Sequence, residues 1–139
     1  MKHSDLNLFK EKGEKITCLT AYDSSIAKLI DDCCVDIVLI GDSLGMVIQG
    51  YKNTRSVTMQ DMLYHTEIVA NSCQQALVIA DMPFQSYDSG ELALINAQNL
   101  VNAGADMVKI EGGQEHEEVF RVLSSNNINI CGHLGLQPQ

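Results

Sequence analysis

The sequence predicts an α/β fold built on a mostly parallel sheet. Apolar runs typical of buried strands alternate with segments of helical periodicity along the whole chain. This alternation is typical of right-handed βαβ units. In addition, four of the apolar runs end in a charged or titratable side chain, at Asp42, Asp81, Glu111 and His133. Ligands of parallel α/β folds bind at the carboxyl ends of the strands, so these ends predict one shared site.

The first elements follow from local signals. Residues 1–13 are expected to form an N-terminal helix from about Ser4 to Lys12, and residues 15–20 the first strand. Asp23 or Ser24 is placed to cap the next helix. Four apolar residues of that helix share one face at helical spacing: Ile26, Leu29, Ile30 and Cys33. The second strand is expected at residues 35–42, followed by a long connection.

The remaining elements repeat the pattern. Thr58 and Asp61 have capping-box spacing and open a helix. Its inward face is predicted to be Met62, Leu63, Thr66, Val69 and Cys73. Residues 76–81 form the third strand, and Ser89 caps a helix that ends at Gly104. Residues 106–111 form the fourth strand, and after Gly112-Gly113 a helix carries Val119, Phe120 and Leu123. Residues 128–133 form the fifth strand.

Two architectures fit five such strands. One is an open doubly wound sheet, and the other is the first part of a (β/α)8 barrel, which typically takes ~250 residues. On the barrel interpretation, residues 1–139 are the N-terminal part of a single (β/α)8 domain, and residues 14–139 contain its first five strands. Five strands alone leave the first and fifth as open edges. Composition does not distinguish these architectures.

Composition excludes several classes of function. The net charge is −9 without a basic patch, which argues against nucleic-acid binding. The N-terminus is charged and has no apolar core of a signal peptide, and no apolar run approaches the ~20 residues that span a bilayer. The five cysteines have no CxxC spacing, so we expect small core residues in a reducing cytosol. His3, His65 and His116 are expected to be ordinary surface residues.

The strand ends carry the chemistry. Lys109 and Glu111 are two residues apart in one strand, so their side chains share a face. They form either a buried ion pair that only stabilises the sheet or part of a binding site. Asp42 and Asp81 either cap following helices or bring carboxylates together. Converging carboxylates repel one another, and a divalent cation relieves that repulsion, with oxygen ligands favouring Mg²⁺.

Two further residues have a structural and a functional interpretation. Ser43 is a turn or cap residue whose hydroxyl and backbone N–H are also placed to contact a ligand. His133 either forms a hydrogen bond within the core or acts at the strand ends. Together, the strand-end groups predict metal-assisted chemistry on a small anion.

Five segments together resemble one family: TAYD (20–23), GDSLGMVIQG (41–50), ADMPF (80–84), GADMVKIEGG (104–113) and GHLGLQPQ (132–139). They are similar to ketopantoate hydroxymethyltransferase, an enzyme family of pantothenate biosynthesis. The resemblance implies a (β/α)8 barrel, a bound Mg²⁺ and a homodecamer in the cytoplasm. It also implies transfer of a hydroxymethyl group from 5,10-methylenetetrahydrofolate to 3-methyl-2-oxobutanoate, giving 2-dehydropantoate.

Site residues carry over by position. The resemblance implies Asp42, Asp81 and Glu111 as metal-site carboxylates, and Asp42, Ser43, Asp81 and Lys109 as contacts of the keto acid. His133 falls where the family has an active-site histidine. The family's general base, a glutamate, belongs to a strand after the fifth. Gln137 stands where the family usually has threonine.

Two alternatives to a complete enzyme remain at this point. One is a truncated, non-catalytic remnant that keeps at most metal or keto-acid binding. The other is a phosphoacceptor receiver domain, which has similar length and uses acids and a lysine around Mg²⁺. A receiver domain needs its lysine at the end of the fifth strand, whereas Lys109 belongs to the fourth.

Overall fold

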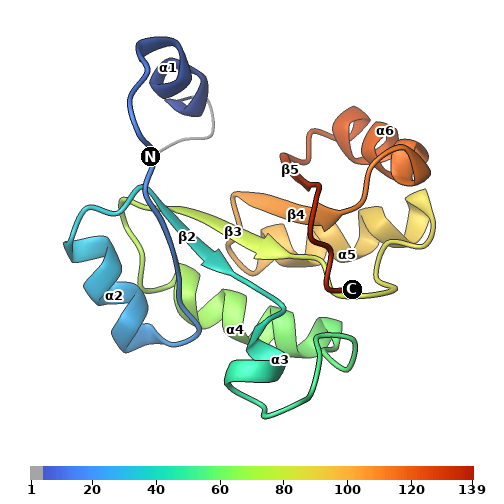
Figure 1. The fold of residues 1–139 in the computed structure, drawn as a ribbon, viewed down its shortest axis with the longest axis horizontal. Coiled ribbons are helices and arrows are strands. Elements are labelled where there is room, and N and C mark those ends of the chain that lie inside the picture. The colour runs from blue at the N-terminus through green and yellow to red at the C-terminus, as the bar shows by residue number, and fades with distance from the viewer. Residues whose placement is uncertain (1–4) are drawn as a thin grey trace.

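The chain forms one parallel five-stranded sheet with helices between successive strands (Figure 1). The computed structural model describes residues 5–139, so His3 and the predicted helix start at Ser4 lie outside the described residues. The elements are α1 (Asp5–Lys12), β1 (Cys18–Thr20), α2 (Ser24–Asp32), β2 (Ile37–Ile40), α3 (Leu44–Val47), α4 (Met59–Ala70), β3 (Leu77–Asp81), α5 (Gly90–Asn102), β4 (Met107–Glu111), the 3₁₀ turn η1 (Gln114–His116), α6 (Glu117–Ser125) and β5 (Ile130–His133).

The order of the strands identifies the architecture. The strands lie side by side as β1-β2-β3-β4-β5, and all four pairings are parallel. A doubly wound sheet reverses its strand order at a switch point, as in the order 2-1-3-4-5 of flavodoxin-like folds, which include receiver domains. Sequential order instead matches five successive units of a (β/α)8 barrel, so the doubly wound and receiver interpretations are wrong. As predicted, β1 and β5 are the edges of this sheet.

The two faces of the sheet differ, because successive side chains of a strand point to opposite faces. On the outer face, Val38, Val78 and Val108 pack under the helices in the main core. Figure 1 shows α2, α4, α5 and α6 around this outer side, whereas α1 lies apart from them. The inner face begins with a smaller apolar cluster at Ile37, Leu77 and Ile79, against which Leu6 of α1 packs.

Helix signals in the sequence are largely confirmed. Asp23 caps α2, and Ser89 caps α5, which ends before Gly104 at φ 108°. Thr58 and Asp61 form both hydrogen bonds of the predicted capping box on α4. The inward residues Met62, Thr66 and Val69 are buried, as are Val119 and Leu123 of α6.

Several local predictions are wrong. In α2 the buried positions are Ala27, Ile30 and Asp31, whereas Ile26, Leu29 and Cys33 are exposed. Cys73 lies beyond the end of α4, and β1 begins only at Cys18 because it is an edge strand with one neighbour. None of the five cysteines is fully buried. Cys73 packs against the main core and Cys131 against the inner-face cluster, as predicted for core residues, whereas Cys18, Cys33 and Cys34 are exposed.

Polar side chains connect the amino ends of neighbouring strands. Asp36 accepts hydrogen bonds from the backbone N–H and the hydroxyl of Thr17, and Asp106 accepts one from the Val78 N–H. Each aspartate directly precedes a strand, so its carboxylate reaches a backbone donor of the strand beside it. These bonds hold the strands in register at the end opposite to the candidate site.

Asp31 is the buried polar group on which the α2 side of the fold depends. Its carboxylate accepts hydrogen bonds from three consecutive backbone N–H groups, those of Gln74, Gln75 and Ala76, at 2.8–2.9 Å. Burial alone would raise the pKa of Asp31, but these hydrogen bonds hold that pKa below its ordinary value. This carboxylate therefore anchors the segment between α4 and β3 to the end of α2.

We predict that Asp31→Ala lowers the free energy of unfolding by about 2–4 kcal/mol, because it leaves three backbone donors without their charged acceptor. Asp32→Ala is the matched control, since Asp32 is exposed and pairs with Lys28 across one helical turn; its effect should stay within about 0.5 kcal/mol. Urea denaturation measures both. Equal effects of the two substitutions would contradict the anchoring role.

Candidate functional site

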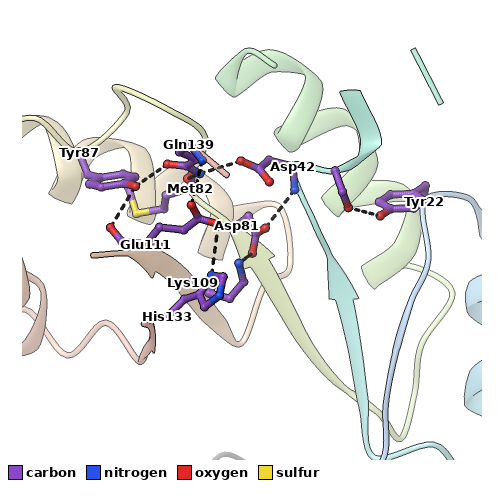
Figure 2. A network of polar contacts seen from close by, with 10 residues as sticks. Tyr22, Asp42, Asp81, Met82, Tyr87, Lys109, Glu111, His133 and Gln139 are labelled. Carbon is purple, nitrogen blue, oxygen red and sulfur yellow. Dashed lines mark hydrogen bonds and ion pairs between the residues drawn. The ribbon is translucent and has the colours of Figure 1, made fainter. Parts of the chain in front are cut away.

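Asp42, Asp81 and Lys109 meet at the carboxyl end of the sheet (Figure 2). Lys109 Nζ lies 2.8 Å from Asp81 Oδ1, and the backbone N–H of Asp42 donates to Asp81 Oδ2 at 3.0 Å. Both aspartates are only 3% exposed. Asp81 ends β3 and is in register with Lys109 of β4, while Asp42 lies two residues beyond β2. The sequence prediction that these side chains gather at one place is confirmed.

Glu111 and His133 form the neighbouring pair. They are register partners at the ends of β4 and β5, and His133 Nδ1 lies 3.2 Å from Glu111 Oε1. Glu111 is 5% exposed, whereas a third of the His133 side chain is exposed. The histidine therefore links a buried carboxylate to the open side of the site. As predicted, Lys109 and Glu111 share the inner face, and Val108 and Ile110 are buried on the other.

Gln139 joins the two groups, although sequence reasoning did not single it out. Its side-chain Nε2 donates to Asp42 Oδ2 at 2.7 Å and to the Met82 carbonyl at 3.0 Å. Its backbone N–H donates to Glu111 Oε2 at 3.1 Å. The Tyr87 hydroxyl donates to its Oε1, and Arg55 Nε to its carbonyl. Only long-range contacts identify this residue, since it lies 97 positions from Asp42 in the chain.

Ser43 is held at the edge of the cluster by Tyr22. The two hydroxyl oxygens are 2.8 Å apart, and a Cβ atom on Gly41 would lie 3.0 Å from Ser43 Oγ and 3.6 Å from both Asp81 Oδ2 and the Tyr22 hydroxyl. Glycine at 41 therefore leaves the space that these groups share. Ser43 also precedes α3, but its side chain forms no cap on that helix.

Two histidines expected at the surface are in fact half-buried. His65 Nδ1 lies 2.7 Å from the Tyr22 carbonyl oxygen, which requires the Nδ1–H tautomer because a carbonyl only accepts. His116 packs its ring edgewise against Tyr87, with ring centroids 5.0 Å apart. Their positions in helical sequence patterns gave no sign of these contacts.

Burial and like charges raise the pKa values of the acidic groups at the site. Burial, and next the charge of Asp81, raise the pKa of Asp42 to about 6. Burial also raises the pKa of Asp81, against the opposing effect of Lys109. Burial and the charge of Glu111 raise the pKa of Tyr87 to about 12, so its hydroxyl stays protonated and donates. The site therefore disfavours the ionised forms of these groups, first through burial and then through like charge.

The donor set fits a divalent cation of the Mg²⁺ type, although not as three protein ligands at once. Among residues 5–139, no three His, Cys, Asp or Glu side chains are arranged so that they could hold one metal ion. The contacts explain this, because Lys109 pairs with Asp81 and the Gln139 amide lies between Asp42 and Glu111. Mg²⁺ commonly takes one or two carboxylates and completes its shell with water and substrate. Two buried, mutually repelling aspartates meet that requirement.

Comparison with known proteins identifies the family of the chain. The family model of ketopantoate hydroxymethyltransferase matches residues 1–139. The chain belongs to the ketopantoate hydroxymethyltransferase family. It is 63% identical over 134 residues to 3-methyl-2-oxobutanoate hydroxymethyltransferase of Vesicomyosocius okutanii and 61% identical to that of Ruthia magnifica, covering 96% of this chain and 52% of each relative. The chain therefore spans about half the length of the curated relatives it matches.

A solved structure supports the fold independently. The crystal structure of 2,3-dimethylmalate lyase, a PEP mutase/isocitrate lyase superfamily member, superposes with a TM-score of 0.66 at 15% identity, over 93% of this chain and 51% of the other. At this identity the likeness shows the barrel fold alone. No helix of residues 5–139 is long and apolar enough to cross a membrane.

We predict that Asp42→Asn stabilises the chain above pH 6 in buffer with EDTA. The pKa of Asp42 is raised in the folded state, so its ionised carboxylate destabilises the fold. This destabilisation is absent below pH 4 and reaches its full size above pH 6. The substitution should raise the free energy of unfolding by about 1–2 kcal/mol at pH 8 and change it little at pH 4. Urea denaturation across this range measures the difference. The exposed Asp88→Asn is the control, and an equal gain at both pH values would contradict the assignment.

Proposed function

We propose that these residues form the metal- and keto-acid-binding part of a 3-methyl-2-oxobutanoate hydroxymethyltransferase. The observation that carries the proposal is the buried Asp42–Asp81–Lys109 group at the ends of β2, β3 and β4, in a chain of this family. It combines carboxylates for a cation with one ammonium group for an anion. The curated relatives have the name of this activity, and the chain spans about half of their length.

The chemistry of a 2-oxo acid fits this group. It presents keto and carboxylate oxygens, which are ligands that Mg²⁺ accepts. Asp42 and Asp81 would hold that ion together with water, and Glu111 would reach it through water. A bound Mg²⁺ would supply Lewis-acid stabilisation of the enolate that forms when C3 loses its proton. Lys109 is placed to offer its charge to the substrate carboxylate while it stays paired with Asp81. Ser43 is placed to donate its hydroxyl, which Tyr22 orients.

In this proposal the reaction joins two carbons. The C3 proton passes to the base, which the family places on a later strand, and C3 then bonds to the methylene carbon of 5,10-methylenetetrahydrofolate. The bonds from this methylene carbon to N5 and N10 of the folate break, and water supplies the hydroxyl of the product. The C3 proton and the remaining water proton pass to the two nitrogens as tetrahydrofolate leaves. His133, held through Nδ1 by Glu111, keeps its other nitrogen available beside the substrate. A cytoplasmic location and a homodecamer are further proposals that rest on the family alone.

The remnant hypothesis differs in one measurable respect. Both it and the enzyme hypothesis expect binding at the strand ends, but only the enzyme hypothesis expects the downstream reading frame to encode strands six to eight and a strand-end glutamate. Reading that DNA distinguishes the two, since a stop codon followed by unrelated sequence would leave only the remnant.

We predict that the chain binds 3-methyl-2-oxobutanoate in the presence of Mg²⁺ and that Asp81→Ala abolishes this binding. The substitution removes both a cation ligand and the partner of Lys109. Isothermal titration calorimetry measures the affinity with and without EDTA. Asp32→Ala, an exposed aspartate far from the strand ends, serves as the control. Binding that is indifferent to EDTA would contradict the role of the metal.

We predict a different pattern for Lys109→Met. Keto-acid affinity should fall about tenfold or more, because a charge-assisted contact to the substrate carboxylate is lost. Mg²⁺ affinity should rise, since Asp81 loses a competing cation. Titrations with each ligand separate the two effects. Unchanged keto-acid affinity would show that Lys109 serves only to hold β3 to β4.

A further inference from the structure

Gln139 holds the carboxylate of Asp42 in place (Figure 2). Asp42 lies two residues beyond β2, so the pairing of the sheet does not fix its backbone. Asp81 is held at both carboxylate oxygens, by Lys109 and by the Asp42 N–H. The carboxylate of Asp42 is held at Oδ2, where the side-chain amide of Gln139 donates at 2.7 Å. The orientation of Asp42 toward a bound cation therefore depends on where this amide lies.

The orientation of the Gln139 amide follows from its neighbours. Its Nε2 lies 3.0 Å from the Met82 carbonyl oxygen, which only accepts hydrogen bonds, so this side of the amide must be the NH2 group. Its Oε1 then faces the Tyr87 hydroxyl, which donates to it. A flipped amide would turn its oxygen toward Met82 and Asp42, where neither the carbonyl nor an ionised carboxylate has a proton to donate. One orientation thus satisfies all three contacts.

The main chain of Gln139 is held as well. Its N–H donates to Glu111 Oε2 at 3.1 Å, and its carbonyl oxygen accepts from Arg55 Nε at 2.8 Å. Arg55 belongs to the connection between α3 and α4, and Glu111 ends β4, so two segments far apart in the chain fix this residue. These contacts, like the two that orient the amide, do not involve Asp42. The amide is therefore in place before the carboxylate accepts from it, as preorganised support of a binding site requires.

We propose that Gln139, oriented by Tyr87, is a positioning residue for the cation site of Asp42 and Asp81. The inference rests on the proposed function, because it requires that these aspartates hold Mg²⁺. Two buried carboxylates at neighbouring strand ends repel one another, and an Asp42 side chain free to turn would relieve that repulsion by moving away from Asp81. The amide opposes this motion through Oδ2 and leaves Oδ1 for the cation. Groups that hydrogen-bond to metal ligands in this way contribute about 10–100-fold to metal affinity.

The test titrates the full chain with Mg²⁺ by isothermal titration calorimetry. Gln139→Met keeps the length of the side chain and the main-chain contacts but loses the amide, so Mg²⁺ affinity should fall about tenfold. Tyr87→Phe loses the hydroxyl that holds Oε1 while the amide remains, and affinity should fall about threefold. The double variant should bind Mg²⁺ as weakly as Gln139→Met alone, because Tyr87 acts through Gln139.

Gln137→Met is the matched control. Gln137 and Gln139 both line a cleft of about 190 Å³ beside Tyr87 and His116, but Gln137 is exposed. The same substitution two residues earlier should therefore leave Mg²⁺ affinity unchanged. It removes an amide of the same kind from the same segment without touching Asp42.

Urea denaturation in EDTA separates positioning from a merely structural role, which would lower the free energy of unfolding without changing Mg²⁺ affinity. Unchanged or tighter Mg²⁺ binding by Gln139→Met would overturn the inference and leave the proposed function intact, and so would additive losses in the double variant. A wild-type chain that binds no Mg²⁺ would overturn the proposed function and the inference with it. Where Gln139→Met is unstable, Tyr87→Phe measured against Gln137→Met decides, because equal Mg²⁺ affinities of these two variants would overturn the inference.

Discussion

The ion pair between Asp81 and Lys109 is the contact on which the carboxyl end of the sheet depends. It joins β3 to β4 across the inner face, and the second oxygen of Asp81 accepts the Asp42 N–H that follows β2. One carboxylate thereby positions residues from three strands. Because Asp81 is almost fully buried, the loss of its charged partner would be costly. The same pair also keeps an anion-binding ammonium group and a cation-binding carboxylate within contact of each other.

The inner face of the sheet changes character along the strands. At the amino ends it is apolar, at Ile37, Leu77 and Ile79, and at the carboxyl ends it has Asp81, Lys109 and Glu111. The apolar half and the outer core stabilise the sheet, while hydrogen bonds from Asp36 and Asp106 hold the strand starts in register. The charged half is thus held on rigid strands rather than on loops, which suits a site that must keep like charges close together.

Gln139 connects this site to the neighbouring cleft, which it also lines. The side-chain amide of Gln139 donates to Asp42 and to the Met82 carbonyl, and its backbone N–H donates to Glu111. A cation held by Asp42 would share this carboxylate with the Gln139 amide. Tyr87, with a pKa raised to about 12, remains a donor to Gln139 throughout the neutral range. The last residue described therefore links the proposed keto-acid site to the cleft around Tyr87 and His116.

The sequence by itself determined the elements and the strand-end residues. Period-two alternation placed Lys109 and Glu111 on one face, and the spacing of Thr58 and Asp61 identified a helix start, because both signals are local. The pattern of elements left open whether the sheet is doubly wound or part of a barrel, since that depends on which strands pair, and only the family resemblance implied the barrel. Strand order in the tertiary structure made that decision. Long-range packing likewise decided the exposure of Leu29 and Cys33, the burial of Asp31, and the bridging place of Gln139. Such features depend on residues far apart in the chain, and their physical cause is the approach of segments that no local pattern encodes.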